Sequence, residues 1–182
     1  MPLSFQTKHA DQTSTNFVSR IWDSLLINDL ATQEQFEEYR SKFDWWWFPL
    51  HDSEWEREMY AKDHTIREDR HNRWRVGMPI HFVINNRRPD RLQFAPVLPV
   101  TALQHIRIEK IKDASFDDPK NKHNHPLRHL KKFAIEIDGK PWHDITSLSS
   151  RDGFIFESQF IRWWPEGVFE GKIIHWTNKW KY

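Results

Sequence analysis

The chain has 182 residues, 15% of them aromatic with 11 Trp among them, which is enough to enclose a single hydrophobic core. The mean hydropathy of -0.82 and short apolar runs exclude a membrane-spanning helix. The absence of Cys excludes disulfides, thiolate metal sites and a cysteine nucleophile. The amino-terminal residues show no basic segment leading into an apolar stretch, so we expect a cytoplasmic location without a secretory signal.

The net charge of +1 is unevenly distributed along the chain. Residues 1–61 contain five Lys/Arg and eleven Asp/Glu, whereas residues 62–182 carry a net charge of +7. A modest positive field raises the local concentration of phosphate-bearing ligands, but it is far from the basic footprint of an obligate duplex-DNA binder. An ordinary mixed surface is the alternative interpretation.

The first 60 residues are predicted to be mainly helical. Residues 1–13 have few apolar side chains and are expected to form a loose tail. Thr15 and Asn16 can cap a first amphipathic helix, and residues 32–35 open a second. Residues 44–50 are predicted to be a strand and residues 52–60 a short helix that ends just before Lys62. The apolar positions that support the two amphipathic helices are Phe17, Ile21, Leu25, Leu26, Phe36, Tyr39 and Phe43.

The remainder of the chain is predicted to be mostly strand. Asp138-Gly139 is a strong hairpin-turn dipeptide. A long exposed loop is expected where Lys, Asn, His and Asp dominate. The predicted strands cover residues 79–85, 93–109, 133–137 and 168–176, the loop covers 113–129, and a further amphipathic helix covers 156–164.

Lys62, Thr65 and Arg67 are the residues of greatest chemical interest. Residues two apart in a strand share a face, so Thr65 and Arg67 are expected on the same side, with Lys62 just upstream. A cation, a hydroxyl and a guanidinium could then converge on one anion or one polar ring. Solvated charges at the start of an edge strand are the alternative interpretation.

The pattern Lys62-x-x-Thr65-Ile66-Arg67, followed by Trp74-x-x-Gly77 and the strand of residues 80–84, resembles the opening of an ASCH domain, a branch of the PUA-like proteins. Residues 94–108 and 148–154 are similar to that family's following strand and late acidic turn. The resemblance covers about residues 44–182 and implies an α+β fold, a PUA-like β-pseudo-barrel with flanking helices. Residues 1–43 would be an N-terminal tail and helical addition packed on that domain.

The resemblance also implies site residues. The common family form has Gly two residues before the lysine and Glu three after it, where this chain has Tyr60 and Thr65. Thr65 matches a subset of small bacterial members that resemble amidohydrolases of N4-acylated cytidine. The family's acid falls on Asp152, a shorter side chain, and Glu157 is a competing candidate.

Three functions are compatible with these residues, and the first two use the Lys62, Thr65 and Arg67 side chains directly. In the first, Lys62 and Arg67 contact a phosphate or a ring carbonyl of RNA or of a modified nucleoside, and Trp46 or Trp74 stacks on the base. In the second, the protein is an amidohydrolase with Thr65 as nucleophile, Lys62 as its base and an acidic partner.

A metal-dependent ribonuclease is the third alternative, suggested only by other members of the family. His123, His125 and His129 lack a carboxylate or cysteine at a familiar interval, so no metal site and no cofactor are expected. The five glycines are too scattered for a phosphate-binding loop, which argues against nucleoside triphosphate or dinucleotide chemistry.

Overall fold

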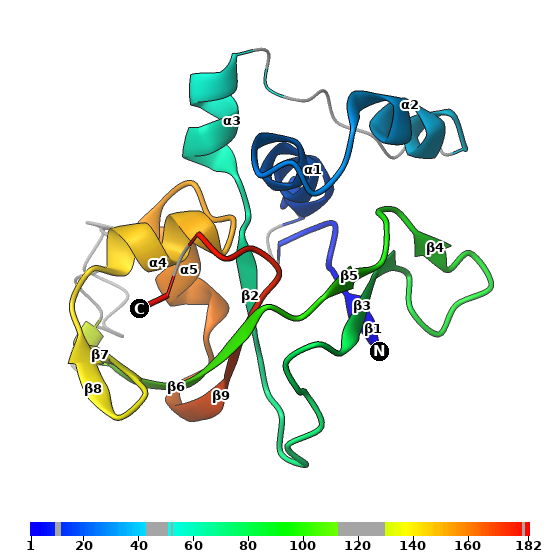
Figure 1. Ribbon diagram of the computed structural model, residues 1–182. Helices are drawn as coiled ribbons and strands as arrows, with labels where there is room; N and C mark the ends of the chain where they lie inside the picture. The colour runs from blue at the N-terminus through cyan, green and yellow to red at the C-terminus, as the bar shows by residue number, and fades with distance from the viewer. Residues whose placement is uncertain (10–11, 43–50, 52, 113–129, 180) are drawn as a thin grey trace.

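Two open sheets and five helices form the described part of the chain, a mixed α+β arrangement (Figure 1). The computed structural model describes residues 1–9, 12–42, 51, 53–112, 130–179 and 181–182. Neither sheet closes into a barrel within these residues, so the pseudo-barrel stays a prediction. The smaller sheet runs β1-β3-β4 with β5 also paired to β3, and the larger runs β2-β9-β6-β7-β8. The small-sheet strands are β1 (Pro2–Ser4), β3 (Pro79–Ile84), β4 (Leu92–Gln93) and β5 (Leu98–Pro99). The large-sheet strands are β2 (His64–Arg67), β6 (Ala102–Lys112), β7 (Leu130–Ile137), β8 (Lys140–Trp142) and β9 (Gly167–His175).

The helices begin close to the predicted positions, with one addition. In α3 the Ser53 side chain accepts from the Glu56 backbone and Glu56 reaches back, a capping box that fixes the helix start. Helix α4 was not predicted, and the Asp144 side chain caps it at the Ser147 N–H, 2.9 Å away. No helix in the described ranges has the length and apolar character needed to cross a membrane. The helices are α1 (Phe17–Ile27), α2 (Gln33–Lys42), α3 (Glu54–Tyr60), α4 (Ile145–Arg151) and α5 (Glu157–Trp163).

The prediction of a loose tail over residues 1–13 was wrong. Residues 2–4 form β1, which pairs in parallel with β3 in the register Leu3 opposite Phe82. Leu3 and Phe5 are each only 3% exposed, whereas Ser4 between them is exposed. This alternation is the pattern of a strand with one buried face, and the burial of two large apolar side chains stabilises its pairing with β3. The sheet pairing therefore crosses the division expected at residue 43, which itself stays a prediction.

The single strand predicted over residues 93–109 is interrupted. The chain forms β4 and β5 before it enters β6, which pairs antiparallel with both β7 and β9. Pro96 lies between β4 and β5, and Pro99 is the last residue of β5, because proline cannot donate to a strand ladder. The Asp138-Gly139 turn was predicted correctly, since both residues have positive φ (50° and 78°) between β7 and β8. The strand expected at 44–50 and the loop at 113–129 lie outside the described residues.

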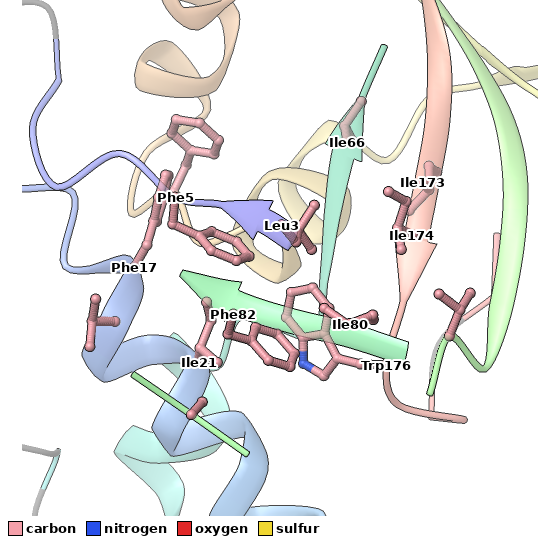
Figure 2. Close-up of a cluster of buried hydrophobic side chains, with 14 of the residues drawn as sticks. Leu3, Phe5, Phe17, Ile21, Ile66, Ile80, Phe82, Ile173, Ile174 and Trp176 are labelled. Atoms are coloured by element: carbon pink, nitrogen blue, oxygen red, sulfur yellow. The ribbon is translucent and has the colours of Figure 1, made fainter. Parts of the chain in front are cut away.

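The core contains buried residues of both sheets and of α1, α2, α4 and α5, and the N-terminal segment packs into it (Figure 2). The ring of Phe5 stacks on that of Phe82 with centroids 6.0 Å apart, and it meets the edge of Trp176 at 6.3 Å. Phe17 of α1 lies on the other side of Phe5 in this view. Residues from both ends of the chain therefore share one packed interior with β3.

Candidate functional site

Lys62 and Asp152 form a buried ion pair at the start of β2. Helix α3 ends at Tyr60, and the Lys62 backbone N–H donates to the Arg20 carbonyl of α1 at 2.9 Å. The Lys62 ammonium donates to Asp152 Oδ1 at 2.5 Å and also to the Asp152 carbonyl oxygen. The two residues are 1% and 4% exposed. The pair is therefore held by α1, α4 and the chain entering β2.

Burial works against both charges of this pair. It lowers the pKa of Lys62 to about 8, an effect that the nearby Asp152 carboxylate opposes and that Arg67 and Arg20 reinforce. Burial likewise raises the pKa of Asp152, opposed by Lys62, by Arg67 and by a hydrogen bond from the Ile66 backbone. A lysine with such a pKa carries a neutral amine in an appreciable fraction of molecules near pH 8, which is a requirement for a lysine base.

Thr65 and Arg67 lie on the same face of β2, as the spacing predicted. Thr65 is 3% exposed and Arg67 is half-buried. The Arg67 Nη2 donates to the Ser4 carbonyl of β1 at 2.6 Å, and the Arg67 charge acts on Asp152. Within the described ranges, the hydrogen bonds of the Lys62 ammonium go to Asp152 and none goes to the Thr65 hydroxyl. We call Lys62, Thr65, Arg67 and Asp152 the Lys62 cluster.

Two phenylalanines, which sequence reasoning did not find, cover the Lys62 cluster. The Lys62 Nζ lies 4.5 Å from the ring centroid of Phe17 and 6.0 Å from that of Phe5. The Arg67 Cζ lies 5.4 Å from the Phe5 ring. These distances are within the range of cation–π attraction. The alternation of Leu3 and Phe5 with polar neighbours is the sequence signal that could have placed Phe5 on a strand.

Gly153 allows this close packing of Lys62. Its φ is +87°, and a Cβ there would lie 3.0 Å from Lys62 Cδ and 3.1 Å from the Phe17 ring. The Arg20 guanidinium donates to the Gly153 carbonyl at 2.7 Å, so α1 is tied to the same turn. A side chain at position 153 would push Lys62 away from Asp152.

The structure describes two of the three other predicted site residues, Trp74 and Glu157. Trp74, expected beside the cluster, is 4% exposed and belongs to the hydrophobic core, and its stacking role stays a prediction. Trp46 lies outside the described residues. Glu157 accepts a hydrogen bond from the Thr146 hydroxyl, whereas the Lys62 ammonium pairs with Asp152. The acidic partner of Lys62 in the structure is thus Asp152.

Among the described residues, the Lys62 side chain is enclosed, with 1% exposure. A cavity of about 450 Å³ instead lies beyond the end of β2, where β9 and β6 run alongside the loop after Arg67. Its charged groups are partly paired with each other, since Lys172 contacts Asp69 at 3.2 Å. The Lys62 cluster does not line it. The lining residues are Glu68, Asp69, Arg70, His105, Val168, Glu170, Gly171 and Lys172.

A buried histidine pair lies on the opposite face of β2. The rings of His64 and His175 are 5.3 Å apart, and the Tyr182 hydroxyl lies 3.3 Å from His64 Nδ1. Within the described ranges, His64 Nε2 and both ring nitrogens of His175 have no hydrogen-bond partner. Burial lowers the pKa of His175 to about 4 and that of His64 well below its ordinary value, so both rings are neutral at pH 7.

Metal ligation was not expected, and the described residues contain no group of three or more His, Cys, Asp or Glu side chains arranged to hold a metal ion. His123, His125 and His129 lie outside those residues. The described donor groups therefore add nothing to the metal-dependent alternative.

Comparison of the chain with models of known protein families, with characterised proteins and with solved structures yields no match.

Proposed function

We propose that the Lys62 cluster binds a planar, uncharged nucleobase, presented either as a nucleoside or in single-stranded RNA. The observation that carries the proposal is the convergence of two cations and a carboxylate next to the ring of Phe17. A base presents hydrogen-bond donors and acceptors on its edge and a π-face for stacking, and this set of groups complements both.

The burial of the cluster favours recognition of a base over recognition of phosphates. A phosphate-contacting lysine has to reach the surface, because the nucleic-acid backbone stays on the outside of a complex. Lys62 is 1% exposed, and its ammonium is already bound to Asp152. The positive balance of residues 62–182 would then act by attracting RNA to the surface, while the buried groups recognise the base.

Titration calorimetry with cytidine, N4-acetylcytidine, uridine and a short single-stranded RNA tests this proposal. Binding of a nucleoside should hardly change between low and high salt, because no counterions are released from a neutral ligand. Arg67→Ala should weaken binding by about 1–3 kcal/mol through loss of a charge-assisted hydrogen bond. Arg70→Ala is the matched control, since Arg70 is exposed and contacts Glu68 at 2.6 Å. Equal losses in the two variants, or affinity only for RNA with a steep salt dependence, would contradict base recognition.

An amidohydrolase is the second candidate, and the lowered pKa of Lys62, about 8, favours it. In this reaction the neutral Lys62 amine takes the proton of the Thr65 hydroxyl as the oxygen attacks the acyl carbonyl of an N4-acylated cytidine. The carbon–nitrogen bond then breaks, and the exocyclic nitrogen leaves with the proton returned by Lys62. Water, deprotonated by the same amine, hydrolyses the threonine ester and releases the carboxylic acid. Asp152 would hold the lysine in position.

This second function requires the Thr65 hydroxyl to come within hydrogen-bond reach of Lys62 when substrate is bound, as catalytic hydrogen bonds often tighten on binding. Chromatography of N4-acetylcytidine incubated with the protein tests it. Thr65→Val should stop the release of cytidine while leaving binding of the acylated nucleoside nearly unchanged, and Thr65→Ser should retain turnover. If wild-type protein at high concentration releases no cytidine, the protein is not this hydrolase.

A further inference from the structure

Ser4, the last residue of β1, and Phe5, which follows it, lie against the Lys62 cluster. Ser4 places its carbonyl oxygen 2.6 Å from Arg67 Nη2. Phe5 places its ring 5.4 Å from the Arg67 guanidinium carbon and 6.0 Å from the Lys62 ammonium. Figure 2 shows the Phe5 ring lying between Phe17 and the rest of the core. We call residues 1–5 the N-terminal cover.

The N-terminal cover presents the same chemical groups as the ligand proposed above. A pyrimidine base carries a carbonyl oxygen that accepts hydrogen bonds and a flat ring that faces a cation. In the structure, the Ser4 carbonyl takes the place of the first group and the Phe5 ring that of the second. The half-buried Arg67 guanidinium thus already has an acceptor from within the protein, and a ligand would have to replace it.

We propose that the N-terminal cover is a built-in competitor of the ligand, and that a planar ring bearing a carbonyl group reaches Lys62 and Arg67 only when residues 1–5 leave β3. This inference rests on the proposed function for the identity of the ligand, but the opening itself does not depend on it. Binding and displacement of the cover are then one event, so the affinity for the ligand includes the work of displacing β1.

The position of β1 makes such an opening local. It has three residues, lies at the end of the order β1-β3-β4 and pairs with β3 in parallel. A short strand at the edge of a sheet can detach while the remaining sheet stays formed. Helix α1 and Phe17 remain in place, because the segment that moves ends before them.

A reversible cross-link between β1 and β3 tests the proposal. Pro2 and His81 are register partners, and the chain has no cysteine, so Pro2→Cys/His81→Cys provides the sole thiol pair. In the oxidised protein the disulfide keeps the N-terminal cover paired with β3, and reduction allows the cover to detach. Accessibility of Lys62 is measured as its rate of modification by an amine-reactive reagent, followed by mass spectrometry.

Two other lysines serve as internal controls in the same experiment. Lys132 has a side chain that is 50% exposed, and it reports the reactivity of the reagent. Lys110 is 9% exposed on β6, where its ammonium donates to the Trp164 carbonyl, and it reports global unfolding. Oxidation should slow modification of Lys62 by about tenfold or more, as expected when a minor open state is removed. Lys110 and Lys132 should be unaffected.

The binding of N4-acetylcytidine and of a short single-stranded RNA is then measured in both redox states. If reduction exposes Lys62 and permits binding, the cover and the ligand compete as proposed. If reduction exposes Lys62 but neither compound binds, the opening is established and the proposed function fails. If Lys62 reacts equally in both states, or changes only together with Lys110, the N-terminal cover is not a local competitor.

A second pair of variants addresses the case in which the cross-link does not form. Phe5→Ala removes the ring over Lys62 and Arg67, and Leu3→Ala weakens the docking of the same strand on β3. Ile108→Ala is the control, since Ile108 is 1% exposed and lies on β6, outside the N-terminal cover. Modification of Lys62 should be about tenfold faster in Phe5→Ala and in Leu3→Ala than in Ile108→Ala. Equal rates in all three variants would overturn the proposal.

Discussion

Substitution of Lys62 by Met tests whether the ion pair with Asp152 is buried and intact. The change removes the cation and leaves the Asp152 carboxylate 4% exposed, with the Ile66 backbone and Arg67 as its remaining partners. Breaking a buried pair by removing one partner typically costs about 3–5 kcal/mol. Because Arg67 still attracts the carboxylate, we expect the lower end, about 3 kcal/mol.

Asp152→Asn should cost less, because Lys62 can lose its proton. The pKa of Lys62, about 8, is one unit above pH 7, and its largest support is the Asp152 charge. Once that charge is removed, the pKa falls and the amine becomes neutral, at a cost of about 1.4 kcal/mol for one unit. With the lost hydrogen bond, the total should be about 2 kcal/mol.

Urea unfolding at pH 7 followed by tryptophan fluorescence gives these free energies, and the double variant Lys62→Met/Asp152→Asn completes the cycle. The double variant should be more stable than the sum of the two losses predicts, by about 1 kcal/mol or more. Lys132→Met is the control, since its ion pair with Glu109 at 3.0 Å is partly exposed and should contribute within about 0.5 kcal/mol. A loss below about 1 kcal/mol for Lys62→Met, with no coupling, would refute the buried pair.

Three further predictions follow from the same geometry. The pKa of Lys62 in the folded protein, about 8, lies below its ordinary value of 10.5, so the unfolded chain binds more protons between these pH values. The stability of the wild-type protein relative to Lys62→Met should therefore rise from pH 8 to pH 10.5. A flat or falling difference in urea midpoints would contradict the lowered pKa. Gly153→Ala should be less stable than Gly139→Ala in thermal unfolding. Both glycines have positive φ (+87° and +78°), but only a Cβ at position 153 would lie 3.0 Å from Lys62 Cδ. Equal losses of stability in the two variants would mean that backbone strain alone, and not contact with Lys62, causes the loss. Gly171→Ala would place a Cβ 2.4 Å from the Arg67 carbonyl oxygen, so amide hydrogen exchange in β2 should accelerate markedly. Unchanged protection of the β2 amides would show that β2 and β9 can move apart enough to accommodate the added methyl group.

The local elements of this protein were largely determined by its sequence. Helix α1 follows from apolar residues at helical spacing, and the turn between β7 and β8 follows from Asp138-Gly139. The shared face of Thr65 and Arg67 follows from the two-residue period of a strand. Each of these features depends on residues that are neighbours in the chain, so a local pattern is enough to specify them.

The site itself was decided by tertiary structure. The pairing of Lys62 with Asp152, the hydrogen bond from Arg67 to Ser4 and the ring of Phe5 over both cations join residues that are 57 or more positions apart in the chain. A sequence pattern shows that these side chains exist and which face of an element they occupy. It does not show which buried faces meet, because that choice depends on how large apolar side chains from distant segments fill one interior. Leu3 and Phe5 illustrate this, since their burial against β3 turned an expected tail into the cover of the site.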